Sequence, residues 1–425
     1  MELFKRLPLE DRASMAGLLL AVLDFDRDAE TYEAYDKMTA HELFIRCGLS
    51  KRLVDDFLRP TLAVGLFAPL EQLSAATTME LLYFYALAHQ DSFDVRWIRS
   101  RSIPELLIAP LAARLQSQHG LTLLPSCRCT GMDTDAVTGA VTAVRYTDSS
   151  GSPAVIADVD AVVLAVGAKG MQAVLSGSPA LAASAPELAA AASLGSIDVI
   201  SVRLWLDRTV ATAHPANVFA RFPELRGAGG TFFMLDQLQA PGRDATDKRR
   251  LWAAADDVDA ATLGSVVAAD FYFAGGLLPM SDEAIVSLLL TRLLPAAVPD
   301  FAGASVLDSA VLRAPSAVSW FSPGSASKRP PLRPAGVSNL ACAGDWVRLG
   351  EREHGAKGLC QERAYVTGLE AANSLIRDGP LRGGGALHPV LPVRPDEPQV
   401  VAGRAAAKAL GDLGRNFGLV APWMR

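Results

Sequence analysis

Alternation of apolar and polar residues predicts several β-strands in the middle of this chain. The segments Ala140–Tyr146 and Val199–Leu206 alternate with a period of two, as strands with one buried face do. Asp158–Gly167 is a nearly continuous apolar run, which is typical of a parallel strand buried on both faces. Leu121–Leu124 and Cys127–Met132 are shorter strand-like segments. The pattern therefore predicts a sheet with at least one buried parallel strand.

Helical patterns surround these strands, and residues 1–90 are almost entirely of this kind. Ser50 is a suitable N-cap for a helix over Lys51–Arg59, and Pro60 is expected to end that helix. Helices alternating with strands predict an α/β fold. The other expected helices, with the residues expected to end two of them, are Leu73–Ala88, Glu105–His119 before Gly120, and Asp282–Leu294 before Pro295.

A strand–loop–helix pattern near the end of the chain carries the clearest chemical signal. The apolar strand within Asn339–Trp346 ends in a glycine and Asp345, and nucleotide cofactors bind at the carboxyl ends of strands in α/β sheets. Gly355 and Gly358 would let a ligand approach the backbone closely. The helix expected from about Leu359 would direct its free N–H groups at negative charge.

This pairing resembles the carboxyl-terminal FAD-binding signature of the flavin amine oxidase superfamily, in its carotenoid-desaturase-like branch. That family has a strand reading Asn-Leu-(apolar)-Ala-Gly-Asp and a helix reading Glu-(small)-(small)-x-x-(Ser or Thr)-Gly-x-x-Ala-Ala. Here the second half reads Glu362-Arg-Ala-Tyr-Val-Thr367-Gly368-Leu-Glu-Ala371-Ala372. The resemblance implies bound FAD and an α/β fold, in which a GR2-type FAD-binding domain is interleaved with a helix-plus-sheet substrate domain.

The resemblance also implies a domain division. The helical segment around Leu43–Arg59 is similar to the substrate domain of carotenoid-desaturase-like flavoproteins. The implied segments are residues 1–90 (helical part of the substrate domain), 91–170 (FAD domain), 171–305 (substrate domain), 306–378 (carboxyl-terminal FAD segment) and 379–425 (a tail). The tail is rich in Pro, Gly and Arg up to Pro398, and we expect it to wrap the surface or to be partly disordered.

The family's cofactor-binding positions can be carried over residue by residue. Cys129 stands where the family has a valine against the adenine, and Asp345 is implied to accept hydrogen bonds from ribityl hydroxyls. Arg363 departs from the family's small residue. His354 and Lys357 would stabilise a reduced, anionic flavin or carry a proton, or else they belong to a solvated charged loop. The implied FAD-binding residues are Cys129, Gly344, Asp345, Trp346, Gly355, Lys357, Gly358, Gln361, Glu362 and Ala364.

One family feature is expected to be missing. The family begins with a strand and a G-x-G-x-x-G turn that holds the FAD pyrophosphate, and the sequence from Met1 shows no such turn. The glycines at Gly227–Gly230 and Gly383–Gly385 neither follow a convincing strand nor open a helix. We therefore expect an incomplete FAD-binding domain that lacks its first βαβ unit.

Composition narrows the possible partners. The chain has 425 residues, half of them apolar, and its mean hydropathy is +0.22, which indicates a large core or an apolar ligand. A net charge of −6 argues against a nucleic-acid partner. Five scattered cysteines favour reduced thiols in a reducing intracellular compartment and no metal site. Peripheral membrane association, at a plastid or cytoplasmic face, would follow from a desaturase-like function.

These observations predict an FAD-dependent oxidoreductase that acts on an apolar small molecule. The first reaction that we expect is the desaturation or isomerisation of a carotenoid or another polyene. Amine oxidation is the alternative within the family, and it would use Trp320 and Trp346 as an aromatic cage. A non-catalytic protein without a competent FAD site is the alternative outside the enzyme class. No side chain is assigned a catalytic role from the sequence.

Overall fold

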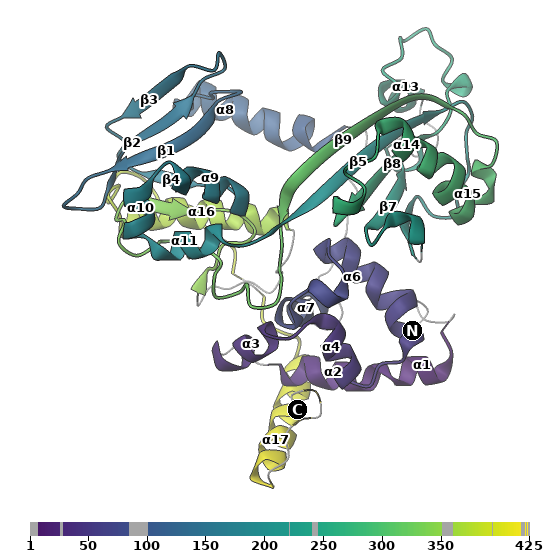
Figure 1. The fold of residues 1–425 in the computed structure, drawn as a ribbon, viewed down its shortest axis with the longest axis horizontal. Coiled ribbons are helices and arrows are strands. Elements are labelled where there is room, and N and C mark those ends of the chain that lie inside the picture. The colour runs from purple at the N-terminus through teal and green to yellow at the C-terminus, as the bar shows by residue number, and fades with distance from the viewer. Residues whose placement is uncertain are drawn as a thin grey trace. The chain divides into compact units, whose positions relative to one another are not determined.

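The computed structural model describes residues 7–25, 29–84, 101–220, 222–239, 245–350, 360–392, 394–417, 421 and 423. The chain folds into two units, each built from separate stretches of sequence (Figure 1). Unit 1 comprises residues 1–93, 126–196 and 316–425, and unit 2 comprises residues 94–125 and 197–315. The chain therefore leaves unit 1 twice and returns to it for its final stretch.

The amino-terminal stretch of unit 1 is helical, as the sequence predicts. Thr39, Ser50 and Ser74 each cap a helix by accepting a backbone N–H from the residue three positions later. The Ser50 cap predicted from the sequence is confirmed. The helices are α1 (Leu9–Ala13), α2 (Met15–Asp24), α3 (Ala29–Asp36), α4 (Ala40–Arg46), α5 (Lys51–Leu53), α6 (Arg59–Leu66), the 3-10 turn Leu70–Gln72 and α7 (Ala75–Leu82).

Two prolines that were expected to end helices lie inside helical segments. Pro60 is the second residue of α6, and Pro295 is the second residue of α15 (Leu294–Ala297). The five residues before each helix form a wider π-helical turn, at Val54–Leu58 and Leu289–Leu293. A π turn shifts the carbonyl that a proline ring would strike, and its i→i+5 pattern accommodates the missing N–H. The prediction that these prolines end their helices was therefore wrong.

Unit 1 contains a parallel strand pair. β4 (Val162–Leu164) pairs in parallel with β10 (Leu340–Cys342), which confirms the predicted parallel strand. The strand is shorter than the apolar run, and the prediction that it is buried on both faces was wrong, because Val163 is 43 % exposed. Asn339 fixes the start of β10. Its amide donates to the carbonyls of Val141 and Asp160, and its oxygen accepts the Val141 N–H at 2.8 Å. This side chain joins β10 to two other stretches of unit 1.

Helices and an antiparallel sheet pack around the parallel pair. Met132, Leu164, Leu340 and Trp346 belong to one buried cluster with apolar residues of three helices. A second cluster joins β10 to the long helix α16. The antiparallel sheet contains β1 (Arg128–Thr134), β2 (Val141–Thr147) and β3 (Pro153–Ala157), and the helices are α9 (Ala168–Ser176), α10 (Pro179–Ser184), α11 (Pro186–Ala192) and α16 (Gln361–Arg377).

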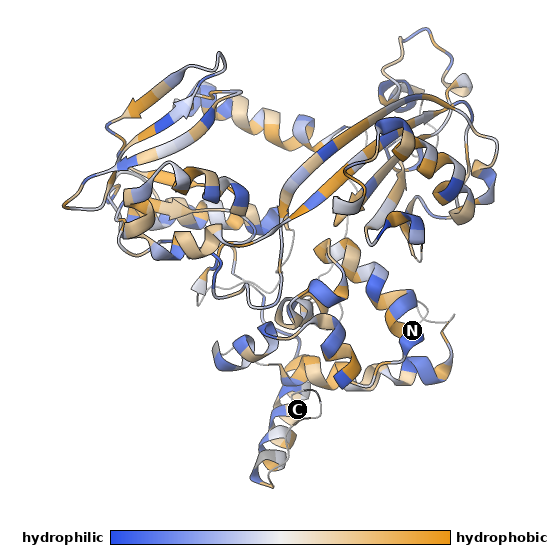
Figure 2. Cartoon of the chain, in the orientation of Figure 1, coloured by the Kyte–Doolittle hydropathy of each residue, from blue (hydrophilic) through white to orange (hydrophobic). Residues whose placement is uncertain are grey.

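The predicted strand at Leu121–Leu124 is not formed. The segment follows α8 (Ala109–His119), which ends at Gly120 in the left-handed conformation, as expected, and it has no paired strand. Leu123 and Leu124 are about half exposed, and Figure 2 shows hydrophobic residues along α8 as well. An extended apolar segment becomes a strand only beside another strand, and the described residues place none next to it.

Unit 2 is built on an antiparallel sheet with the strand order β6-β7-β8-β5-β9. The predicted strand over Val199–Leu206 is confirmed as part of β5. The strands are β5 (Ser196–Leu206), β6 (Ala216–Phe219), β7 (Gly229–Met234), β8 (Val266–Tyr272) and β9 (Val306–Ser319). The other elements are the π turn Pro104–Ile108, α8, α12 (Leu235–Gln239), α13 (Ala245–Leu251), α14 (Asp282–Leu288), α15, and the 3-10 turns Pro223–Leu225, Ala260–Thr262, Ala274–Gly276 and Pro299–Phe301.

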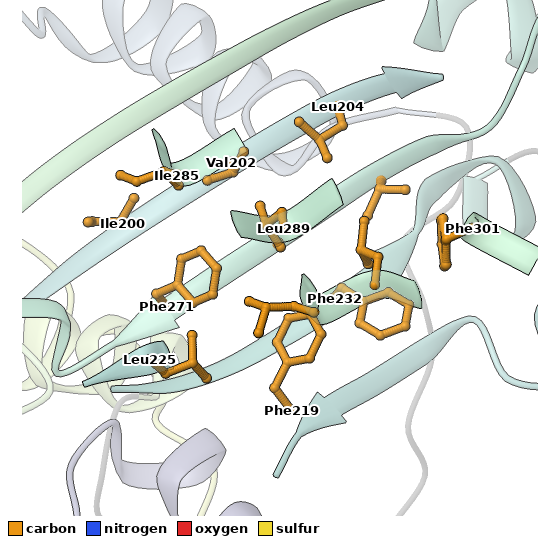
Figure 3. Close-up of a cluster of buried hydrophobic side chains, with 14 of the residues drawn as sticks. Ile200, Val202, Leu204, Phe219, Leu225, Phe232, Phe271, Ile285, Leu289 and Phe301 are labelled. Atoms are coloured by element: carbon orange, nitrogen blue, oxygen red, sulfur yellow. The ribbon is translucent and has the colours of Figure 1, made fainter. Parts of the chain in front are cut away.

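The core of unit 2 lies between this sheet and the helices α14 and α15. Figure 3 shows Phe219, Phe232 and Phe271 from the strands packed beside Ile285 and Leu289. Ser281 caps α14, and the apolar residues of this helix face the sheet. This large core stabilises unit 2 through burial of apolar surface.

Near the carboxyl terminus, where the sequence predicted only a tail, the structure contains the helix α17 (Pro398–Asn416). It packs against α2, and Arg404 donates to the Phe25 carbonyl and lies over the Tyr83 ring at 5.3 Å. Gly403 allows close approach to Leu23. None of the helices within the described residues is both long enough and apolar enough to cross a membrane.

Candidate functional site

Asp345 lies just beyond the carboxyl end of β10, where the sequence predicted a ligand-binding turn. Ser319 Oγ donates to Asp345 Oδ1 at 3.1 Å. Burial raises the pKa of Asp345 above its ordinary value, although the Ser319 hydrogen bond and the charges of Arg363 and Arg329 oppose the rise. The turn therefore presents a half-buried carboxylate within a positively charged environment.

Arg363 holds this turn from the first part of α16. Its Nε donates to the backbone carbonyl of Asp345 at 2.8 Å, and its Nη2 donates to the carbonyl of Val347 at 2.7 Å. The side chain is only 2 % exposed. The arginine that departs from the family's small residue thus fixes the backbone on both sides of Trp346. The sequence could not assign this role, because the bonds cross between two elements.

Arg329 brings a second buried cation to the site. Its side chain is 3 % exposed, its guanidinium lies 4.7 Å from the centre of the Phe321 ring, and its Nε has no hydrogen-bond partner among the described residues. Because guanidinium groups stay protonated, Arg329 and Arg363 give the site two positive charges against the single charge of Asp345. The arrangement suits an anionic ligand that also carries hydroxyl groups, because Asp345 can accept hydrogen bonds from those hydroxyls.

Thr367 joins α16 directly to the glycine before Asp345. The Gly344 N–H donates to Thr367 Oγ1 at 2.9 Å, and the hydroxyl lies 3.0 Å from the carbonyls of Gly344 and Ala364, to one of which it donates at a time. Gly344 has a φ of 135°, which favours glycine. Both backbone polar groups of Gly344 therefore face Thr367, and the role of this glycine is to shape the turn.

Replacing Thr367 with valine is expected to lower the free energy of unfolding by about 1–3 kcal/mol, because the Gly344 N–H would be left without a partner. Valine keeps the shape and removes the hydroxyl. Urea denaturation measures the change, and Thr122→Val is the control because Thr122 is exposed. Equal effects of the two substitutions would show that the Thr367 hydroxyl contributes nothing specific.

Helix α16 begins at Gln361, close to the predicted start. Its N-cap residue Cys360 provides no side-chain cap, and Glu362 places an acidic side chain in the first turn. Gln361 and Glu362 are exposed, whereas the Ala364 N–H donates to the Cys360 carbonyl at 3.1 Å. Of the predicted helix residues, Gln361 and Glu362 remain accessible, and the N–H of Ala364 is used within the helix.

Trp346 and Cys129 lie against the same buried cluster of unit 1. The Trp346 indole is buried and donates to the Val166 carbonyl at 3.1 Å. Cys129 is in β1, next to an irregularity in its pairing with β2. Trp320 donates to the Gln72 carbonyl at 3.0 Å. Trp346 thus belongs to the core, and this burial does not support its predicted role in an aromatic cage.

The glycine-rich part of the predicted site lies outside the described residues. This applies to His354, Gly355, Lys357 and Gly358, so their predicted roles stay predictions. The structure brings together Gly344, Asp345 and the start of α16, and it adds Ser319, Arg329, Arg363 and Thr367, which were not predicted as site residues.

The sequence reasoning also missed a polar group of residues in unit 2. Asp270 lies in the otherwise apolar strand β8, and its strand partners are Ser201 and Thr231. An acidic residue inside an apolar strand is the signal that could have identified it, because buried charges are rare unless they have a purpose or a partner.

No protein-family model matches this sequence, and no curated protein matches it. Solved structures do match the fold. An oxidoreductase from Methanosarcina mazei shares 12 % identity at a TM-score of 0.51, with 84 % of this chain and 71 % of that chain covered. The fold is that of known oxidoreductases. Cyclohexylamine oxidase from Brevibacterium oxydans shares 12 % identity at a TM-score of 0.50, with 87 % and 77 % covered.

At this level of identity the similarity establishes the fold and no more. The predicted combination of helices and sheets is therefore confirmed at the level of a shared fold. The GR2-type assignment, the missing first unit, the carotenoid branch and the domain division stay predictions.

Proposed function

We propose that this chain is an FAD-dependent oxidoreductase that oxidises an apolar small molecule. The observation that carries the proposal is the Asp345 turn at the carboxyl end of β10, with a half-buried carboxylate beside two buried arginines. The fold shared with an oxidoreductase and with cyclohexylamine oxidase supports it. Carotenoid or polyene desaturation or isomerisation is the first substrate class that we propose, on the resemblance of the sequence.

The chemistry of the turn fits FAD. The cofactor carries an anionic pyrophosphate and a ribityl chain with hydroxyl groups, and Arg329 Nε is a buried donor without a partner among the described residues. Asp345 would accept hydrogen bonds from hydroxyl groups, and Arg329 would balance negative charge. The exposed first turn of α16, with Gln361 and Glu362, would add backbone N–H donors. FAD itself supplies the ring that accepts a hydride.

Arg363 and Thr367 would contribute by holding the turn in place. They bond to the backbone of Asp345, Val347 and Gly344 from within α16, so the carboxylate and the helix start keep a fixed relation. Positioned groups of this kind lower the cost of binding, because little has to be ordered when the ligand arrives. The site thus depends on residues that need not touch the cofactor.

Amine oxidation is the second candidate, and one observation favours it. The half-buried Asp270 of unit 2 accepts a hydrogen bond from Ser201, and its carboxylate could also pair with a protonated amine but not with an apolar polyene. This support is independent of Trp320 and Trp346.

The proposal predicts that the purified chain binds FAD and that Asp345→Asn weakens binding about 10–100-fold, because the hydroxyl groups would lose a charged acceptor. Absorbance detects bound flavin, and quenching of protein fluorescence during an FAD titration gives the affinity. Asp256→Asn is the control, since it removes the same charge at an exposed position of unit 2. A chain that shows neither flavin bands nor quenching would refute the proposal and favour a non-catalytic protein.

A further inference from the structure

Unit 1 contains a pocket of about 490 Å³ at the carboxyl-terminal end of α16. It is lined by this helix end, by the turn between β1 and β2, and by the loop that precedes β10. The Asp345 turn bonds to Arg363 near the other end of α16, about 20 Å away at the usual rise of a helix. The pocket is therefore separate from the proposed cofactor site, and its volume can hold a small molecule.

Arg333 gives the pocket a positive charge. Its half-buried guanidinium donates from Nη2 to the Ser338 carbonyl, and its Nε is buried without a hydrogen-bond partner among the described residues. Gly379 leaves room for this group, since a Cβ there would lie 2.9 Å from Arg333 Nη1. Burial lowers the pKa of Arg333, although the charge of Asp378 opposes that change. A partly desolvated guanidinium with unused donors is suited to a carboxylate.

Asp378 gives the same pocket a negative charge. It directly follows the last residue of α16, and it is exposed. Its carboxylate attracts Arg333, but the two side chains are too far apart to form a direct ion pair with each other. The carboxyl-terminal end of a helix carries partial negative charge, which adds to that of Asp378. This side of the pocket therefore favours a cation.

The uncharged part of the lining combines apolar surface with hydroxyl groups. Pro334 and Val337 are buried and apolar. Thr138 donates its hydroxyl hydrogen to a carboxylate of its own turn at 2.9 Å, and Ser374 donates to a carbonyl of α16 at 2.8 Å. These two hydroxyl hydrogens are already used within the protein. The charges that select a ligand therefore come from the arginine and the aspartate.

We propose that this pocket binds a zwitterionic α-amino acid, whose carboxylate pairs with Arg333 and whose ammonium group pairs with Asp378. An amino acid carries both charges close together, so one molecule can bridge two side chains that do not reach each other. A simple anion would be repelled by Asp378, and a simple cation would be repelled by Arg333. The amino acid is a bound ligand and not the molecule that is oxidised, so the inference goes beyond the proposed function.

The test compares leucine with its two singly charged fragments. 4-Methylpentanoate is leucine without the ammonium group, and 3-methylbutylamine is leucine without the carboxylate. Each is titrated calorimetrically into the full chain at about pH 7, where carboxylates and amines carry their charges. We expect leucine to bind about tenfold or more tightly than either fragment. This comparison uses the wild-type protein, so it does not require any variant to fold.

Two variants assign the charges. Arg333→Gln should reduce the affinity for leucine about tenfold, to that of 3-methylbutylamine, because the carboxylate then has no cation. Asp378→Asn should reduce it by a similar factor, to that of 4-methylpentanoate. The controls Arg128→Gln and Asp256→Asn make the same charge changes at exposed positions and should alter neither value.

Leucine binding that is absent, or no tighter than that of either fragment, would overturn the inference. Equal weakening by the pocket variants and by their controls would also overturn it, because the effect would then reflect overall charge. The titrations need no flavin. The FAD proposal can therefore fail in its own spectroscopic test while the amino-acid site stands, and the reverse is equally observable.

Discussion

Replacing Arg363 with alanine is expected to lower the free energy of unfolding by about 3–5 kcal/mol. This is the usual cost of removing one member of a buried charged pair, which leaves the other member without its partner. The substitution removes the donors that bind the Asp345 and Val347 carbonyls and a positive charge close to the Asp345 carboxylate. Because Arg363 is only 2 % exposed, water cannot simply replace it. Urea denaturation followed by circular dichroism measures the loss.

The same helix provides the control for this prediction. Arg377 is exposed in the last turn of α16, so Arg377→Ala should cost less than about 1 kcal/mol, mainly through the helix dipole. Arg363→Lys keeps the positive charge but cannot reach both carbonyls with a planar pair of donors, so we expect an intermediate loss of stability. If Arg363→Ala and Arg377→Ala had similar effects, the turn would not depend on the buried guanidinium.

Replacing Phe232 with alanine is expected to cost about 3–5 kcal/mol, through lost burial and the cavity left behind. Phe232 is fully buried at the centre of the unit 2 core (Figure 3). Its ring centre lies 5.2 Å from that of Phe219 and 6.0 Å from that of Phe301, so the cavity would be bordered by strands and a 3-10 turn. Thermal unfolding measured by calorimetry gives the change.

Val218→Ala is the matched control in the same sheet. Val218 lies on β6 with 45 % of its surface exposed, so its truncation should change stability by about 0.5 kcal/mol or less. Phe232→Leu should lose less than Phe232→Ala, because it leaves a smaller cavity. A small loss for Phe232→Ala would mean that the neighbouring rings collapse into the space.

The sequence identified those elements whose signal is local. Alternation predicted β2 and β5, side-chain caps predicted the start of α5, and the apolar run before Asp345 predicted β10. Each of these signals lies within a few consecutive residues. The segment Leu121–Leu124 had the same apolar character but formed no strand, because pairing depends on what lies beside a segment.

Prolines were misread for a related reason. Both Pro60 and Pro295 follow a π turn, and the helical segment continues past each of them. No residue pattern marked those turns in advance. The ends of these helices therefore could not be predicted, because they depend on a backbone geometry that no sequence pattern indicated.

In the candidate sites, too, single residues could be predicted from nearby sequence, whereas contacts between distant residues could not. Asp345 was identified from its own motif, whereas its contact with Ser319 joins residues 26 positions apart. The acidic Asp270 is visible within an apolar strand, but only the strand register places Ser201 and Thr231 on either side of it. Registers between distant strands are set by the whole sheet, so a single sequence could not reveal this cluster.

The Asn339 clamp has a consequence for the order in which the chain can fold. Its bond to Val141 joins residues 198 positions apart, and the whole of unit 2 from residue 197 to residue 315 lies between them. Distant pairings form late, because a long loop must close before any contact rewards it. During synthesis, that long stretch of unit 2 leaves the ribosome before Asn339 does. The parallel pair of unit 1 must therefore wait until Leu340–Cys342 has been synthesised, and its strand β4 has to avoid aggregation in the meantime.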